Sequence, residues 1–135
     1  MSQSTSFDKL LAAAATQAEP QILLFVFAAA GLPSDASPAQ RARFEVGQGG
    51  ELTPLMCVEK ALDELTTFEA LVAESHDIGP PWTVVFAAGL SGHGGQPPAP
   101  KAVEGALKMM VERVRTGAVE SLLALTPAGE PVRFS

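Results

Sequence analysis

ILLFVFAA, at residues 22–29, is the segment on which the predicted fold rests. All eight residues are apolar, and most of them are large aliphatic or aromatic residues. A strand with one solvent-exposed face alternates apolar and polar residues, whereas an unbroken apolar run is typical of a strand buried on both faces. The segment therefore predicts a strand buried inside a layered fold.

The passage around this strand recurs 61 residues further along the chain. SFDKLLA at residues 6–12 returns as TFEALVA at residues 67–73, and LLF at residues 23–25 returns as VVF at residues 84–86. The recurrence predicts a duplicated helix-strand-helix-strand unit. A chance resemblance in a chain rich in alanine and leucine is the alternative interpretation.

Periodicity, capping residues and breaks at Gly and Pro predict the other elements. Ser37 and Gln40 fit a capping box at the start of a helix. Pro54 donates no ladder hydrogen bond, so its strand either lies at a sheet edge or begins only at Leu55. Helices are expected from Thr5 or Ser6 to Glu19-Pro20 and at residues 37–46, 62–78 and 100–115, and strands at residues 22–29, 52–58, 82–88, 119–125 and, as a short edge strand, 131–134.

The alternation of helices and strands predicts a single α/β domain over residues 1–135, with half-repeats at residues 1–60 and 62–127. The connections between strands are long enough for crossovers, so we expect a mostly parallel sheet of four or five strands. The C-terminal strand follows a turn at Thr126-Pro127-Ala128-Gly129, and we expect it to be antiparallel.

Composition disfavours several classes of partner. The net charge of -6 opposes binding to nucleic-acid phosphates and to anionic lipid. The longest apolar stretch, at residues 22–32, is too short to span a bilayer. A single cysteine, Cys57, excludes an internal disulfide and fits a reducing compartment. We therefore expect a cytoplasmic protein that binds neither nucleic acid nor membrane.

The best candidate for a binding site is the loop GLSGHGG at residues 89–95. It follows a predicted buried strand and precedes a helix, which is where α/β proteins usually bind ligands. With parallel strands it would lie beside the loop at residues 31–35, and the predicted ligand-binding residues are Ser34, Asp35, Ser91, His93 and Gly94. The alternative is a mobile connector, because three nearby prolines remove the backbone donors that an anion would need.

The sequence predicts no catalytic residue, metal ligand or cofactor. Neither His76 nor His93 has a partner at metal-ligand spacing. Cys57 lies between Met56 and Val58 in a predicted strand, and we expect it to be structural.

Taken together, several segments resemble a family of small bacterial proteins. These segments are LFVFA at 24–28, SPAQRARFE at 37–45, PLMCVEK at 54–60 and VVFAAGLSGHGG at 84–95, and the resemblance covers nearly the whole chain. Many members of that family carry the label "ribonucleotide reductase subunit alpha". The residues contradict this label as a statement of activity, since that catalytic subunit needs a radical cysteine and a redox cysteine pair, whereas this chain has Cys57 alone. The family defines no site residues, so none is carried over.

Two functions from different classes are compatible with the sequence. The preferred one is a non-catalytic interaction or accessory module that forms a homodimer or binds another protein. The scarcity of catalytic groups, the predicted edge strand at residues 131–134, and Trp82 and Met109 as exposed contact residues motivate it. The alternative is a small-ligand-binding protein or enzyme that uses the loops at residues 31–35 and 89–95.

Overall fold

The computed structural model describes residues 6–31, 35, 37–45, 51–65 and 67–132, without the side chains of residues 43–45. In this part of the chain, four strands form one sheet in the order β2-β1-β3-β4, and every neighbouring pair is antiparallel. The strands are β1 (Gln21–Gly31), β2 (Glu51–Ala61), β3 (Val84–Ser91) and β4 (Leu123–Leu125). The helices are α1 (Ser6–Ala15), α2 (Pro38–Glu45), α3 (Phe68–Ile78) and α4 (Pro100–Thr116), with a 3₁₀ turn η1 (Leu62–Glu64).

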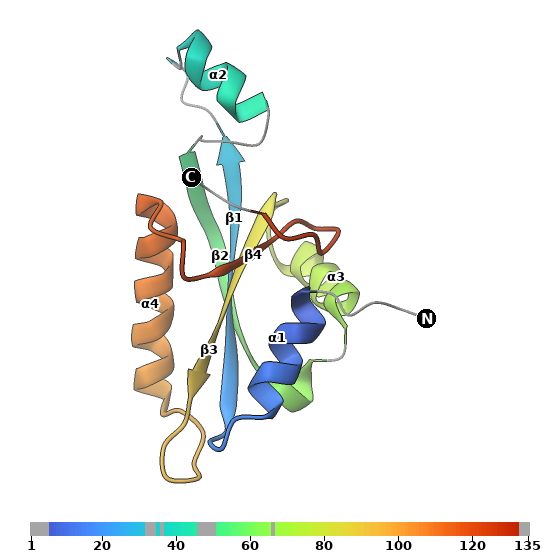
Figure 1. Cartoon of the computed structure of the whole chain (residues 1–135), viewed down its shortest axis with the longest axis vertical. Coiled ribbons are helices and arrows are strands. Elements are labelled where there is room, and N and C mark those ends of the chain that lie inside the picture. The colour runs from blue at the N-terminus through green and yellow to red at the C-terminus, as the bar shows by residue number, and fades with distance from the viewer. Residues whose placement is uncertain (1–5, 32–34, 36, 46–50, 66, 133–135) are drawn as a thin grey trace.

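The helices form layers on the two sides of the sheet. Figure 1 shows α4 on one side of the strands and both α1 and α3 on the other. None of the helices in the described residues is both long enough and apolar enough to cross a membrane. The structure is therefore a three-layer α/β arrangement around an antiparallel sheet.

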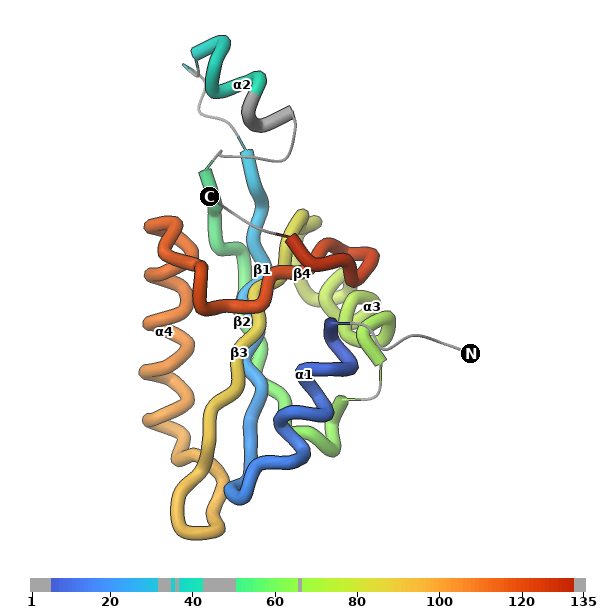
Figure 2. Tube along the Cα trace, viewed as in Figure 1, coloured from blue at the N-terminus to red at the C-terminus, as the bar shows by residue number. Residues whose placement is uncertain are grey.

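The predicted parallel sheet is wrong, because β1 and β2 form a long hairpin. Ile22 lies opposite Ala61 at one end of this hairpin, and Gly31 lies opposite Glu51 at the other. A crossover helix would have to pack back onto the sheet, but α2 lies beyond the tips of β1 and β2 (Figures 1 and 2). Its sequence, PAQRARFE, has no apolar stripe that could cover a sheet face. The chain therefore returns beside β1 in the opposite direction.

Strand β1 is covered on both faces, as its apolar run predicts. The side chains of residues 23–28 are almost completely inaccessible to solvent. Successive side chains of a strand point to opposite faces, so one strand supplies two separate cores. Leu23, Phe25 and Phe27 pack in one cluster with Phe7 of α1 and Leu71 of α3, and Leu24, Val26 and Ala28 pack in another with Val103, Met110 and Val114 of α4.

Strand β2 lies at an edge of the sheet, which confirms the prediction made from Pro54. The pairing with β1 shifts between Phe27 and Ala28, where Leu55 is the extra residue of a bulge. A missing donor, a bulge and a charged side chain such as Glu59 each discourage another strand from pairing with an edge. The long outer edge of β2 is therefore poorly suited to strand addition.

The sequence signals for helix starts are confirmed at one helix and corrected at another. The Ser37 amide donates to Gln40 Oε1 at 2.7 Å, and the Gln40 amide donates to Ser37 Oγ at 3.1 Å, so the predicted capping box is present. The helix predicted at residues 62–78 instead begins at Phe68, because Thr67 Oγ1 accepts a hydrogen bond from the Ala70 amide and caps it there.

The two copies of the proposed repeat place their helix phenylalanines in the same core cluster but their strand phenylalanines in different clusters. Phe7 and Phe68 lie in the same core cluster, with ring centroids 5.3 Å apart. Phe25 and Phe86, which are aligned by the repeat, belong to opposite clusters. The internal duplication stays a prediction.

Trp82 is buried, contrary to the prediction that it is an exposed contact residue. Its side chain is only 4% exposed and its ring packs edge-on against Phe27, with centroids 4.9 Å apart. The indole Nε1 donates to Ser75 Oγ at 2.7 Å, which satisfies a donor that water cannot reach. Met109 is exposed, as expected, with 59% of its surface accessible.

Replacing Ser75 by alanine removes the acceptor for the buried indole N–H. We expect Ser75→Ala to lower the free energy of unfolding by about 1–3 kcal/mol, which is the usual cost of an unpaired buried donor. The matched control is Ser121→Ala, where an exposed hydroxyl accepts a hydrogen bond from Arg113; we expect a change within about 0.5 kcal/mol. Urea unfolding followed by Trp82 fluorescence measures both. Equal losses in the two variants would contradict the buried position of Trp82.

Candidate functional site

The loop predicted as a ligand site is a defined hairpin and not an irregular connector. His93 and Gln96 exchange backbone hydrogen bonds of 3.0 and 3.1 Å across a turn formed by Gly94 and Gly95. Both glycines have positive φ angles, 61° and 80°, as this kind of two-residue turn requires. Glu19 Oε2 accepts a hydrogen bond of 2.7 Å from the Gly95 amide, which ties the hairpin to the segment before β1.

The structure does not bring the predicted ligand-binding residues together. Ser91 ends β3, His93 and Gly94 follow it, and all three are exposed at the end of the sheet where β1 begins. Asp35 is exposed beyond the other end of β1, an 11-residue strand that spans roughly 35 Å at about 3.3 Å per residue. Ser34 lies outside the described residues. The expected grouping depended on parallel strands, and the antiparallel pairing of β1 with β3 separates its two halves.

Groups that could bind a ligand in the hairpin already have partners within the protein. Ser91 Oγ accepts a hydrogen bond of 2.7 Å from Gln21 Nε2. The Gly92 amide donates to the Pro20 carbonyl oxygen at 2.7 Å. His93 does not line the cavities beside β4, beside Phe7 or beside Gly89. The hydrogen bonds of the hairpin thus fix the end of β3 and leave few groups to bind a small ligand.

Other reactive side chains are dispersed over the described structure. Cys57 lies in β2, as predicted, but its thiol is exposed. His76 stacks on Trp82, with ring centroids 6.2 Å apart. Across the described ranges, no group of three His, Cys, Asp or Glu side chains is close enough to hold a metal ion. Lys60 pairs with Glu74 at 2.8 Å and so links β2 to α3.

A different feature of β3 stands out, because its neighbour β4 is much shorter. Strand β4 has three residues where the sequence predicted seven. In the described structure it pairs with β3 only at Val85, Phe86 and Ala87, and on its other side Leu125 forms an antiparallel bridge with Pro131. The other edge of β3 pairs with β1 along its whole length, from Val84 to Ser91. Residues 88–91 therefore have a strand on one side and no strand on the other within the described part of the chain.

The backbone groups of Gly89 and Ser91 point toward this open side. In an antiparallel pair, residues opposite one another alternate between hydrogen-bonded and non-bonded pairs. Gly92 donates to Pro20, so the next pair, Ser91 with Gln21, is a non-bonded one, and the alternation makes Gly89 another. The N–H and C=O groups of both residues face away from β1, in line with those of Val85 and Ala87 that hold β4.

On the face covered by α1, the open edge borders a small apolar cavity. The cavity has a volume of about 160 Å³, is open to solvent, and has Gly89, which carries no side chain, as part of its lining. Gln21 is a polar residue of the cavity lining, and its side chain donates a hydrogen bond to Ser91 Oγ. Its walls include Leu10, Ala13, Gln17, Gln21 and Leu23.

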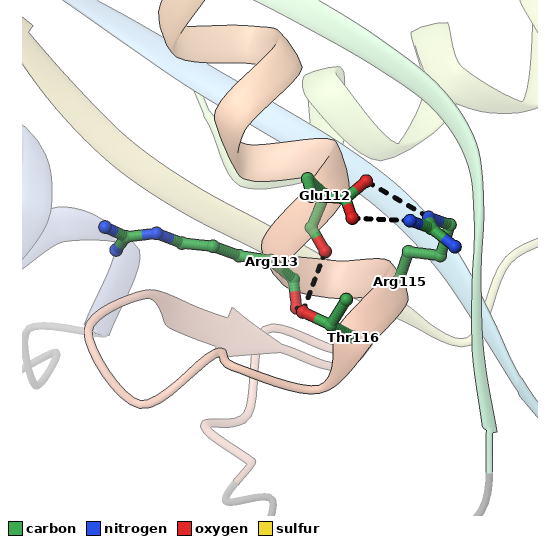
Figure 3. Close-up of polar contacts among 4 residues, drawn as sticks. All are labelled: Glu112, Arg113, Arg115 and Thr116. Atoms are coloured by element: carbon green, nitrogen blue, oxygen red, sulfur yellow. Dashed lines mark hydrogen bonds and ion pairs between the residues drawn. The ribbon is translucent and has the colours of Figure 1, made fainter.

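On the face covered by α4, the open edge carries Leu90, and Met109 is exposed on α4. Leu90 is half-buried against the core beneath α4. Arg113 Nη1 donates to Ser121 Oγ at 2.9 Å, just before β4, so this side of α4 faces the β4 edge of the sheet. Met109 precedes Arg113 by one helical turn and shares that side. Figure 3 shows Arg113 extending from the opposite side of the helix to Arg115, which pairs with Glu112.

The sequence interpretation missed this edge because it ended the strand at residue 88 and assigned Gly89 to a loop. A signal was present, since a glycine inside a strand often marks a place where another backbone or ligand approaches closely.

Two glycines in and after β3 make a matched test of the geometry. A Cβ atom at Gly89 would lie 3.5 Å from Gln21 Oε1 and 3.7 Å from Leu23 Cδ2, which are ordinary contacts. We expect Gly89→Ala to raise the free energy of unfolding by about 0.4–1 kcal/mol, because alanine loses less backbone entropy on folding. A Cβ atom at Gly92 would overlap the backbone of Gln96, so Gly92→Ala should destabilise by more than about 1 kcal/mol. Thermal unfolding measures both, and a stable Gly92→Ala variant would contradict the hairpin.

Comparison of the chain with protein-family models, curated proteins and solved structures found no match. The comparisons therefore assign no activity to the fold or to the open edge of β3. The family resemblance noted from the sequence stays a prediction.

Proposed function

We propose that this chain is a non-catalytic interaction module that binds an extended segment of a partner protein as an added strand on β3. The observation that carries the proposal is that the outward backbone groups of Gly89 and Ser91 have no partner among the described residues, next to a β4 that ends too early to pair with them. Strand addition to an exposed sheet edge is a common mode of peptide recognition, in which backbone hydrogen bonds supply affinity.

The surroundings of the edge support this function. Helix α1 lines one face of the sheet beside Gly89, and α4 packs on the other face mainly against β2 and β1, so an added strand would meet an apolar surface on the α1 face. Backbone hydrogen bonds are stronger where water is excluded. The hairpin bonded to Glu19 and Pro20 holds the lower end of β3 in place before any partner arrives, which reduces the entropy lost on binding.

The alternative of a small-ligand site or enzyme at Ser91, His93 and Gly94 has weaker support. The Ser91 hydroxyl is engaged by Gln21, and the neighbouring Gly92 and Gly95 amides are engaged by Pro20 and Glu19. A bound anion would have to displace these contacts. An exposed free thiol at Cys57 fits a reducing compartment, and for this reason we also propose a cytoplasmic location.

Amide hydrogen exchange measured by NMR on the free protein tests whether the edge is open. We expect the amides of Ala88 and Leu90, which face β1, to exchange at least about tenfold more slowly than those of Gly89 and Ser91. Equal protection of all four amides would mean that something already occupies the edge and would overturn the proposal. A homodimer through this edge would appear as protection of Gly89 and Ser91 that rises with protein concentration.

Binding is tested with a phage-displayed library of seven-residue peptides, selected on the wild type and on two variants of Ser91. Ser91→Pro removes the outward N–H, and we expect it to weaken binding of the selected peptides about tenfold or more, since one hydrogen bond and close backbone approach are lost. Ser91→Ala keeps the N–H and should bind as the wild type does. Thermal unfolding checks that both variants fold. Selected peptides that bind the Ser91→Pro variant as tightly as the wild type would overturn strand addition at β3.

A further inference from the structure

We infer, on the basis of the proposed function, that the segment bound at β3 has four paired residues, an aliphatic side chain opposite Gly89, and basic residues on both flanks. The length follows from the two ends of the open edge. Leu123 of β4 already pairs with Ala87 at the upper end, and Gly92 turns away to bond with Pro20 at the lower end. The four residues between them span about 13 Å at roughly 3.3 Å per residue.

The aliphatic side chain follows from the cavity beside Gly89. Residues directly opposite one another in a sheet point to the same face, so the partner residue opposite Gly89 would point toward α1. There it meets the cavity of about 160 Å³ lined by Leu10, Ala13 and Leu23. The hollow is open to solvent and its lining includes Gln17 and Gln21 beside the apolar residues, so an aliphatic side chain such as Leu or Ile can lie in it against Leu10 and Leu23.

The neighbouring residues of the segment would point to the opposite face, which carries Leu90 and is covered by α4. Met109 is 59% exposed, and its flexible thioether can adapt to side chains of different shape. A segment with apolar residues on both faces therefore fits the edge better than one with alternating apolar and polar residues.

The basic flanks follow from charge. The chain has a net charge of -6, and Glu19 lies beside the hairpin at the lower end of the open edge. A protein with this balance attracts cationic segments and repels anionic ones. Lysine or arginine residues outside the four paired positions would therefore speed association.

Fluorescence anisotropy with three labelled eight-residue peptides tests the inference. The first has two lysines at each end and the core Val-Leu-Val-Thr; the second replaces the leucine by serine; the third replaces the lysines by glutamates. We expect the serine peptide to bind about tenfold or more weakly, because a buried leucine side chain is lost. The glutamate peptide should also bind more weakly, by a factor that shrinks as salt is added.

Two pairs of protein variants locate the binding. Gly89→Val fills the cavity and should weaken the leucine peptide about tenfold while leaving the serine peptide unchanged; Gly89→Ala serves the same purpose if the valine variant does not fold. Met109→Gln should weaken the leucine peptide. Its matched control is Ile78→Gln. Ile78 is 60% exposed, nearly the same as Met109, and it is the last residue of α3, at the opposite end of β3 from the open edge.

The outcomes distinguish strand addition itself, the side-chain preference of the bound segment and the identity of the partner. If the leucine and serine peptides bind equally and Ser91→Pro weakens both, strand addition stands and the inferred side-chain preference is wrong. If no peptide binds the wild type at 1 mM, or if Met109→Gln and Ile78→Gln have the same effect, the inferred segment is wrong. A dimer seen by light scattering, together with protection of the Gly89 and Ser91 amides without peptide, would assign the edge to a second copy of this chain and overturn the inference.

Discussion

Strand β1 needs apolar cover on both faces at once, because successive side chains at residues 23–28 point in opposite directions. This requirement explains why the chain uses its helices as two separate layers, with α1 and α3 on one face and α4 on the other. It also explains why β1 is central, since an edge position would leave part of this strand in contact with water. Phe25 and Phe27 on one face and Leu24 and Val26 on the other could not all be buried this completely in a two-layer fold.

The local elements could be predicted well from the sequence because their signals are local. The capping box at Ser37 and Gln40, the apolar stripe of α4 and the edge position of β2 all depend on residues within a few positions of one another. Strand direction could not be predicted in the same way, because an apolar run looks the same whichever way its neighbour runs. The sequence of α2 did contain a clue, since a helix without an apolar stripe cannot cover a sheet as a crossover.

The open edge at Gly89 and Ser91 was harder to predict, because it results from a difference in length between two strands that are far apart in the sequence. The predicted strand that includes β4 starts at Val119, and only the structure shows that Val119 and Leu122 pack in the core beneath α4 instead of extending the strand. Trp82 was misjudged for a related reason. A tryptophan next to two prolines suggests a surface turn, but its N–H found an acceptor on α3.

The bulge and proline in β2 have a consequence for the size of any complex that this protein forms. A sheet with two receptive edges can add copies without limit and grow into fibres, whereas a sheet with one blocked edge stops after a single addition. Pro54 and the bulge at Leu55 block the outer edge of β2, and the receptive edge on β3 is short and flanked by β4 and the hairpin. Complexes built in this way have a fixed stoichiometry of one segment per chain, which protects an alanine-rich, strongly apolar β-structure from polymerising.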